Sequence, residues 1–176
     1  MHVLLIGLRA SGKSTLGRGL AAALARPFID LDDATAALMR AQSAAEAINT
    51  QGLSAFRLAE TQALREVLAF PSPHIIALGG GTPTAPGAAD LLRAAMGDGK
   101  ACVIYLRAQA ATLQARLRQS DTATRPSLTG ASVVDEVPVL FAQRDELYTL
   151  LANNTLNIDT MDEPQAIAAL RLMATK

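Results

Sequence analysis

The chain has 176 residues, of which 50% are hydrophobic and 18% are charged, a composition that excludes a disordered chain. Its 16 basic and 16 acidic residues cancel, and this balance argues against a nucleic-acid-binding protein, which usually carries a basic excess. The N-terminus lacks the basic segment of a signal peptide, and no apolar run approaches the ~20 residues that cross a bilayer. The single cysteine, Cys102, suits a reducing compartment. We therefore expect one domain over residues 1–176 of a soluble, cytoplasmic protein with no nucleic-acid or membrane partner.

Short apolar runs alternate along the chain with longer stretches of helical periodicity, the pattern of stacked β-α units. Buried strands are predicted at residues 3–6, 27–30, 74–78, 102–106 and 154–158. Helices are predicted at residues 13–25, over most of 33–70 and from about 163. Five buried strands joined by helices indicate an α/β fold with three layers, α/β/α, around a five-stranded parallel sheet. Right-handed crossovers bring the carboxyl ends of the strands to one edge, where ligands bind in such folds.

The first predicted strand runs directly into a glycine-rich loop, GLRASGKS, at residues 7–14. The loop matches G-x-x-x-x-G-K-[ST], and the buried strand before it and the amphipathic helix after it supply the context that this motif requires. Glycines let backbone N–H groups wind around an anion at a helix N-terminus. Lys13 would reach the β- and γ-phosphates, and the hydroxyl of Ser14 can bind Mg²⁺. The loop therefore predicts a nucleoside triphosphate site.

The second strand ends in FIDLDD, which places carboxylates at the ligand edge of the sheet. Because strand side chains alternate, we expect Asp30 and Asp32 on one face, where like charges repel unless a cation or a substrate compensates them. Asp33 is expected to be the N-cap of the following helix. No Asp follows the third or fourth strand, so Asp30 is the natural candidate to support a metal ion.

Two arginines and a glycine triplet complete the candidate site. Arg57 lies in GLSAFRLAE and Arg144 in QRDELY, and a guanidinium fork suits bidentate binding of a carboxylate or a phosphate. Each arginine, taken alone, is equally compatible with an ordinary surface charge. The triplet Gly79, Gly80 and Gly81 follows the third strand, either as a flexible turn or as backbone that approaches a ligand closely.

The polar segment QSDTATRPSLTGASVV, at about 119–134, is long for a loop in a compact domain and is typical of a functional lid or a disordered segment. The motifs GLRASGKST, FIDLDD, GLSAFRLAE, ALGGGT, ATRPSLTG and QRDELY, in this order, resemble the shikimate kinase family from near end to end. The resemblance implies a nucleoside-monophosphate-kinase-like P-loop fold with a mobile lid and a substrate-covering segment at about 33–62. It also implies a monomer that uses ATP and Mg²⁺ to phosphorylate the 3-hydroxyl of shikimate, in the shikimate pathway of aromatic amino-acid biosynthesis.

The resemblance further implies a set of site residues, carried over motif by motif. Those implied for catalysis are Lys13, Asp32 and Arg125. Those implied for ATP are Gly7, Ala10, Ser11, Gly12, Lys13, Ser14, Thr15, Arg118 and Arg125. Those implied for the substrate are Asp32, Arg57, Gly79, Gly80, Gly81 and Arg144, and those for the metal are Ser14 and Asp30. In this scheme Asp32 is the base or orienting group, Arg125 reaches the transferring phosphate from the lid, and Arg118 flanks the adenine.

Three alternatives remain open on the sequence. A gluconate-type kinase on the same scaffold would also bind a carboxylate, although the glycine triplet together with FRLAE favours shikimate. A nucleotide-binding regulatory module without transfer activity is disfavoured because every proposed catalytic position is occupied. A nucleic-acid-directed kinase is disfavoured by the zero net charge and by the scarcity of aromatic side chains for base stacking. The Ala-rich stretch at 36–50 departs from the family and bears on substrate affinity.

Overall fold

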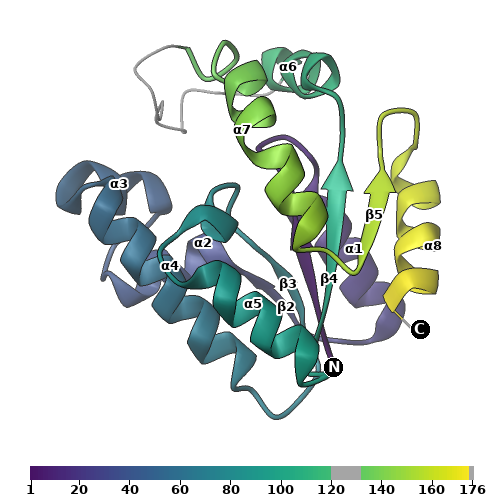
Figure 1. Cartoon of the computed structure of the whole chain (residues 1–176), viewed down its shortest axis with the longest axis horizontal. Coiled ribbons are helices and arrows are strands. Elements are labelled where there is room, and N and C mark those ends of the chain that lie inside the picture. Colours follow the sequence, from purple (N-terminus) through teal and green to yellow (C-terminus); the bar gives the residue numbers. More distant parts are fainter. Residues whose placement is uncertain (120–131, 175–176) are drawn as a thin grey trace.

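The computed structural model of the chain describes residues 1–119 and 132–174 (Figure 1). The strands are β1 His2–Ile6, β2 Phe28–Asp30, β3 Ile75–Ala77, β4 Ala101–Arg107 and β5 Asn154–Asn157. The helices are α1 Lys13–Leu24, α2 Leu31–Leu38, α3 Ala44–Gln51, α4 Leu53–Leu68, α5 Ala88–Gly97, α6 Ala110–Gln119, α7 Val137–Leu150 and α8 Glu163–Ala174, with a 3-10 turn, η1, at Thr82–Thr84. The expected lid at 119–134 lies outside the described residues except at its two ends.

The five strands form one parallel sheet in the order β2-β3-β1-β4-β5, which confirms the expected fold class. Strand β1 is central, with Val3 opposite Ile75 on one side and opposite Cys102 on the other. Both of its faces are covered, and this explains why its sequence, HVLLI, is apolar without alternation. The loop that follows β1 therefore leaves the middle of the sheet at its carboxyl edge.

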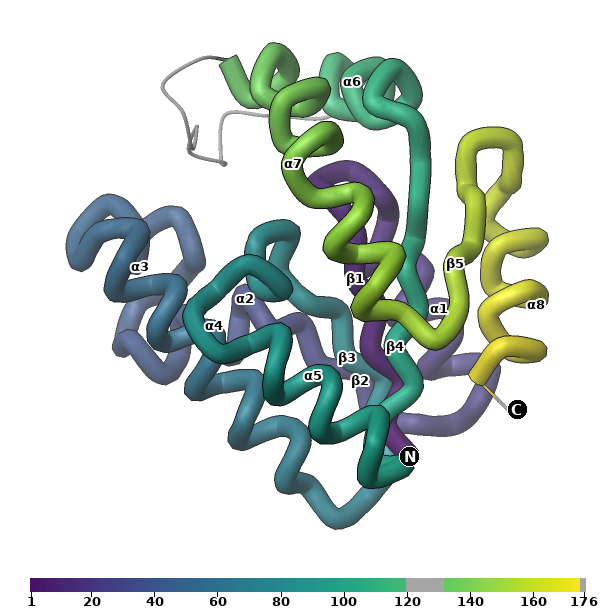
Figure 2. Tube along the Cα trace, viewed as in Figure 1, coloured from purple at the N-terminus to yellow at the C-terminus, as the bar shows by residue number. Residues whose placement is uncertain are grey.

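Helices cover the sheet on both faces (Figures 1 and 2). The connection through α1 leads from β1 to β2, and the connections through α4, α5 and α7 lead across the sheet in the opposite direction. Because these connections are right-handed, α1 lies on one face of the sheet and α4, α5 and α7 lie on the other. Helix α8 packs against α1, so these two helices form one outer layer. The arrangement is the three-layer sandwich that the sequence indicates, with the strand ends exposed between the layers.

The core is built from aliphatic side chains, as the low aromatic content predicts. Every residue of β1 from Val3 to Ile6 is fully buried, and each such side chain contributes about 1.5–3 kcal/mol relative to an exposed one. Cys102 is buried and unpaired. The two largest fully buried side chains are the tyrosines, Tyr105 on β4 and Tyr148 on α7. Both rings lie between the sheet and α7.

The segment after β2 differs from the expectation in its boundaries. Strand β2 ends at Asp30 and α2 begins at the next residue, so Asp32 lies in the first turn of a helix and not on a strand. The N-cap of α2 is Asp30, whose carboxylate accepts a hydrogen bond from the N–H of Asp32 at 3.2 Å. The prediction that Asp33 is the cap was wrong, because the carboxylate that can reach the free N–H groups is the one just before the helix.

The expected helical stretch 33–70 divides into α2, α3 and α4. The breaks fall where the backbone turns left-handed, at Arg40 with φ of 56° and at Gly52 with φ of 88°. Helix α3 lies at the far end of this unit, away from β1 (Figure 1). Within residues 1–119 and 132–174, no helix combines the length and the apolar character needed to cross a bilayer.

Candidate active site

A cleft of about 650 Å³ lies at the carboxyl edge of the sheet, over the loop that follows β1. Its lining comes from the phosphate loop, the end of β2, helices α3 and α4, the glycine loop after β3 and helices α6 and α7. The expected site residues that line it are Ala10, Gly12, Lys13, Ser14, Thr15, Asp30, Asp32, Arg57, Gly80, Gly81 and Arg144. Residues far apart in the sequence therefore meet where the fold predicts a ligand site.

The phosphate loop has the backbone that its glycines predict. Gly12 has φ of 80° and Ala10 has φ of 64°, so the chain turns left-handed twice within three residues. Gly7 is needed because neighbouring atoms lie too close to its backbone for a side chain. A Cβ there would lie 2.6 Å from Ser11 Oγ and 2.8 Å from the carbonyl oxygen of Leu106. The loop thus packs tightly against β4 and opens directly into the N-terminus of α1, where backbone N–H groups and the helix dipole favour an anion.

Lys13 and Ser11 place polar side-chain atoms at this loop. Lys13 Nζ donates to the carbonyl oxygens of Gly7 and Leu8, both at 3.0 Å, so the ammonium lies directly over the loop. The hydroxyl of Ser11 is buried and makes no hydrogen bond within the described part of the chain. An unpaired buried hydroxyl is costly unless a ligand satisfies it. This loop therefore fits the phosphates of a nucleotide.

Ser14 and Asp30 form the candidate metal site. Ser14 Oγ donates to Asp30 Oδ2 at 2.6 Å, which brings a hydroxyl and a carboxylate oxygen together beside the phosphate loop. These hard oxygen donors are the ligands that Mg²⁺ prefers, and Mg²⁺ characteristically uses one or two protein ligands together with waters and substrate phosphates. The donor set therefore fits Mg²⁺, and Asp30 serves both as this donor and as the cap of α2.

Asp32 lies deep in the cleft in a setting that favours its protonated form. Burial raises the pKa of Asp32 to about 6, and the neighbouring carboxylates of Glu60 and Asp30 add to the shift. Gly79 explains the crowding: a Cβ at this position would lie 2.3 Å from Asp32 Oδ1 and 2.5 Å from Glu60 Oε1. A carboxylate with a pKa near neutrality is suited to accept a proton at physiological pH.

Arg57 is held by a fully buried acid. Glu60, one turn further along α4, forms an ion pair with Arg57 and accepts a hydrogen bond from Thr82 Oγ1 at 2.6 Å. Gly81 makes room for the guanidinium, since a Cβ there would lie 2.3 Å from an Arg57 nitrogen. The Arg57 fork is therefore fixed in the cleft and is not an ordinary surface charge.

Arg144 reaches the cleft from α7, opposite Arg57. Its Nη1 donates to the carbonyl oxygen of Gly80 at 2.9 Å. Tyr148, one turn later on the same helix, donates its hydroxyl to the same oxygen at 2.7 Å. The glycine loop thus contacts both arginines, and the cleft presents two guanidinium groups from different elements.

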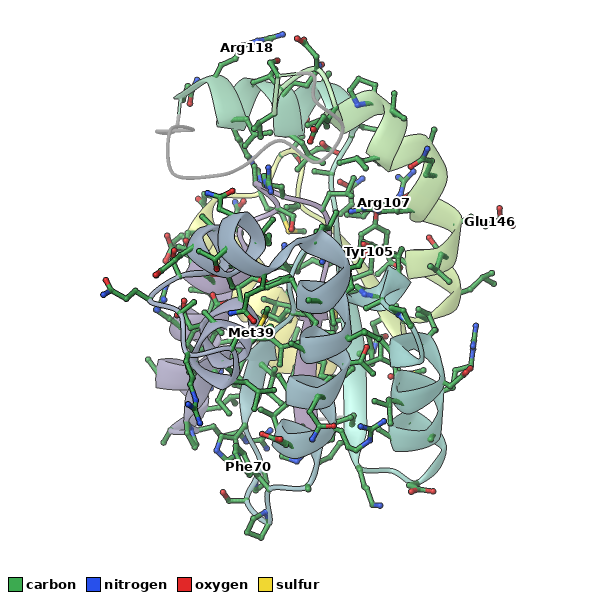
Figure 3. All side chains as sticks on the ribbon, turned by 90° about the vertical axis from the view of Figure 1, so that its left-hand side faces the viewer. Met39, Phe70, Tyr105, Arg107, Arg118 and Glu146 are labelled. Carbon is green, nitrogen blue, oxygen red and sulfur yellow. The ribbon has the colours of Figure 1, made fainter. Side chains whose placement is uncertain are left out.

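The structure does not bring Arg118 into the cleft. Arg118 is exposed at the last turn of α6, and Figure 3 shows it on the outer side of that helix. Arg116 lines the cleft instead and donates from Nη2 to the carbonyl oxygen of Ile158 at 2.9 Å. Positions two apart on a helix point to nearly opposite sides, so only one of the two can face inward. In this structure Arg116 therefore lines the cleft and Arg118 does not, and the assignment of Arg118 to the adenine stays a prediction. Arg125 lies outside the described residues.

Sequence reasoning missed three residues of this site: Glu60, Tyr148 and Arg116. Glu60 carried a signal, because it follows Arg57 by three residues and such pairs share a helix face. Tyr148 lies one turn from Arg144 in the motif QRDELY, a spacing that also places both on one face. Arg116 had no comparable signal, since its place in the lining of the cleft depends on the rotation of α6. Of the other expected site residues, Gly7, Ser11 and Gly79 are not part of the lining of the cleft.

Comparisons with known proteins agree with this geometry. A family model described as shikimate kinase matches residues 9–174. A shikimate kinase 2 from Syntrophotalea carbinolica is 36% identical over 173 residues, which cover 97% of this chain and 95% of that protein.

Two solved structures share the whole fold. A shikimate kinase from Acinetobacter baumannii, in complex with shikimate, superposes with a TM-score of 0.82 at 26% identity and covers 99% of this chain and 93% of its own. A shikimate kinase from Bacteroides thetaiotaomicron gives a TM-score of 0.83 at 27% identity, with coverage of 100% and 99%. Six motifs in order, a parallel sheet with its cleft at the carboxyl edge and these relatives lead to one conclusion: the chain belongs to the shikimate kinase family.

Proposed function

We propose that the protein transfers the γ-phosphate of ATP to the 3-hydroxyl of shikimate, as a single-domain enzyme of the shikimate pathway. One observation carries the proposal: the phosphate loop, Asp32, Arg57 and Arg144 line the same cleft. A nucleotide bound at the loop and a carboxylate bound between the arginines would meet beside Asp32. Cytoplasmic location and a monomeric state stay predictions.

Arg57 and Arg144 would hold the carboxylate of shikimate. They come from α4 and α7, and the backbone of Gly80 and Gly81 lies between them. Bidentate hydrogen bonds from charged donors are about twice as strong as those between neutral groups. Glu60 prevents Arg57 from swinging into solvent, so the acceptor would meet a preorganised fork. Binding at the carboxylate would fix which ring hydroxyl faces the phosphate loop.

Asp32 would orient the acceptor hydroxyl and accept its proton. Its pKa of about 6 leaves the carboxylate mostly ionised at neutral pH. Lys13 would leave the carbonyl oxygens of the loop and bind the β- and γ-phosphates. Ser14 and Asp30 would hold Mg²⁺, which neutralises charge on the phosphates when it is bound.

Two further residues would complete the nucleotide site. Arg118, at the exposed last turn of α6, would stack its guanidinium on the adenine, in a chain that contains no Trp. Arg125 would deliver positive charge to the transferring phosphate, a contribution of ~10³–10⁵ in rate in comparable enzymes. The role of Arg125 rests on the sequence motif ATRPSLTG alone.

The test is ADP production from Mg-ATP in a coupled assay with shikimate, with gluconate and with no acceptor. We expect turnover that depends on shikimate. Turnover with gluconate in place of shikimate would reassign the acceptor, and ADP release without any acceptor would reduce the protein to a nucleotide hydrolase or regulatory module.

A further inference from the structure

A polar cluster fastens α7 to the sheet outside the cleft. Asp145 accepts two hydrogen bonds from Arg107, from Nε and from Nη2, each at 2.8 Å. Tyr105 donates its hydroxyl to Asp145 Oδ1, also at 2.8 Å. Arg107 ends β4, and its guanidinium lies over the ring of Phe141, 5.4 Å from the centroid and one turn before Asp145 on α7. Figure 3 shows Tyr105 and Arg107 beside α7.

This cluster is built more strongly than an ordinary surface ion pair. The side chains of Arg107 and Asp145 are 28% and 23% exposed, whereas those of the surface pair Arg93 and Asp90 are 56% and 85% exposed. Hydrogen bonds from Arg107, and after them the one from Tyr105, lower the pKa of Asp145 against the opposing effect of burial. A two-pronged, partly buried pair has a defined geometry, so it can fix an orientation and not only add attraction.

Helix α7 has few fully buried side chains, although Leu140, Phe141 and Leu147 pack partly buried against the core. Within α7, which the structure describes throughout, the buried residues are Val137 and Tyr148. Tyr148 donates to Gly80 at one end of the contact, and its ring packs edge to face on Tyr105 with centroids 5.6 Å apart. Besides this apolar packing, hydrogen bonds attach the helix at two joined points, the glycine loop and the Asp145 cluster. Arg144 is the neighbour of Asp145 on this helix.

We infer that Asp145 is a positioning residue: through Arg107 and Tyr105 it fixes the rotation of α7 about its axis and so places the guanidinium of Arg144 for the acceptor. The inference rests on the proposed function, in which Arg144 binds the carboxylate of shikimate. Side chains end roughly 5–6 Å from a helix axis, so a rotation of ~10° moves the guanidinium by on the order of 1 Å. A misplacement of about 1 Å can cost ~10²-fold in an enzyme that works by positioning.

The test compares Asp145→Asn with Glu146→Gln. Glu146 is the next residue of α7, is exposed and points away from the sheet in Figure 3, so its variant removes the same charge without touching the cluster. We expect Asp145→Asn to raise the KM for shikimate about tenfold and to leave the KM for ATP within about twofold. Glu146→Gln should leave both unchanged. Equal rises in both KM values, or no rise for shikimate, would contradict a positioning role.

A double-mutant cycle separates positioning from general stability. If Asp145 acts through Arg144, then Asp145→Asn should add nothing to the KM for shikimate once Arg144→Ala is in place. An undiminished effect in that background would overturn the inference. Should Asp145→Asn fail to fold, Arg107→Lys keeps the charge and loses the fork, and it should raise the KM for shikimate by a smaller factor while ADP binding stays intact.

Turnover of the wild-type protein distinguishes a failure of the proposed function from a failure of the inference about Asp145. A wild-type protein inactive on shikimate overturns the proposed function and this inference with it. An active wild type whose Asp145→Asn and Arg107→Lys variants keep the wild-type KM for shikimate overturns the inference alone.

Discussion

Gly79 is the position where three polar side chains converge on the backbone. Besides the carboxylates of Asp32 and Glu60, the hydroxyl of Thr82 would lie 2.8 Å from a Cβ added there. Glu60 and Thr82 are fully buried, so neither of them has open space into which to move. At this site the absence of a side chain is what lets the carboxylate of Asp32 and the acid that holds Arg57 lie close together.

Gly79→Ala should therefore disrupt the acceptor half of the cleft. The added methyl group would displace Asp32 and Glu60, and we expect turnover with shikimate to fall at least about tenfold, with a loss of about 1–3 kcal/mol in the free energy of unfolding. Steady-state kinetics and urea denaturation measure both. Gly97→Ala is the matched control, because a Cβ there meets nothing within 4 Å. Equal behaviour of the two variants would show that Gly79 is not crowded.

Asp32→Asn should lower kcat by ~10²–10⁴-fold, the usual contribution of a general base, and should leave nucleotide affinity in place. The amide keeps the size of the side chain but cannot accept the proton. In the wild type, kcat should fall as the pH drops through about 6, because protonation of Asp32 removes the base. Calorimetric titration with ADP and a pH–rate profile measure these effects, and lost ADP binding would assign Asp32 to the nucleotide.

The sequence predicted those parts of the site that depend on local sequence patterns. A glycine loop between a strand and a helix, and carboxylates at a strand end, are patterns that physical requirements keep within a few residues. Glu60 and Arg116 escaped because their roles depend on packing between elements. Asp32 was predicted correctly to lie near Asp30 but for the wrong reason, since helix α2 and not strand alternation places it there.

Helix α3 contributes the outer wall of the cleft, with Ala44, Ala45 and Ile48 facing it. The helix has eight residues, and an isolated helix of this length is unstable in water. Its start is secured by reciprocal hydrogen bonds: Ser43 Oγ accepts from the N–H of Glu46 at 3.1 Å, and Glu46 Oε2 accepts from the N–H of Gln42 at 2.7 Å. The cap therefore supports a wall of the cleft.

Ser43→Ala should loosen that wall. Removing an N-cap hydroxyl costs about 0.5–2 kcal/mol of helix stability. We expect a raised KM for shikimate and an unchanged KM for ATP, since α3 lies away from the phosphate loop. Ser54→Ala, an exposed serine within the first turn of α4, is the control and should change neither. A rise in the KM for ATP instead would mean that α3 also supports nucleotide binding.

At the scale of the whole molecule, the edge of the sheet opposite the cleft, where β1 begins, has a hydrogen bond between His2 and His74. His2, at the start of β1, is buried, and its Nδ1 accepts a hydrogen bond from the backbone N–H of His74 at 3.2 Å. Burial lowers the pKa of His2, and the nearby charges of His74 and the amino terminus add to the effect. The native state therefore favours the neutral imidazole, which can accept this bond.

The free energy of unfolding should consequently fall as the pH drops below about 6.5, because the unfolded state then binds a proton at His2 that the native state resists. Asp32 acts in the opposite direction: its raised pKa stabilises the native state as the pH falls from about 6 toward 4. His2→Asn keeps a hydrogen-bond acceptor and removes the titration. Urea denaturation gives the free energy of unfolding of both proteins at several pH values, and the difference between the two proteins is the contribution of His2. If this difference did not change with pH, the role of His2 would be contradicted.

The overall architecture was predictable because it depends on patterns that extend over the whole chain. Five apolar runs separated by amphipathic stretches admit few arrangements, and right-handed crossovers select among them. The strand order could not be read from the sequence, since the strands are short and nothing in them marks their neighbours. The expectation of five buried strands was wrong for β5, NTLN, in which only Leu156 is buried because this strand lies at the edge of the sheet. Nor could the rotation of α6 and α7, which is set by particular contacts such as those of Arg116 and Asp145.

The Tyr105 and Tyr148 pair gives the protein an intrinsic optical reporter. These are the two tyrosines of a chain that has no tryptophan, and their rings are in contact. One phenol is hydrogen-bonded to Asp145 and the other to Gly80, and a hydrogen bond to a carboxylate quenches tyrosine emission. Ultraviolet fluorescence of the unlabelled enzyme therefore comes from a single place, the contact between α7 and the sheet, and any movement of that helix would change its intensity.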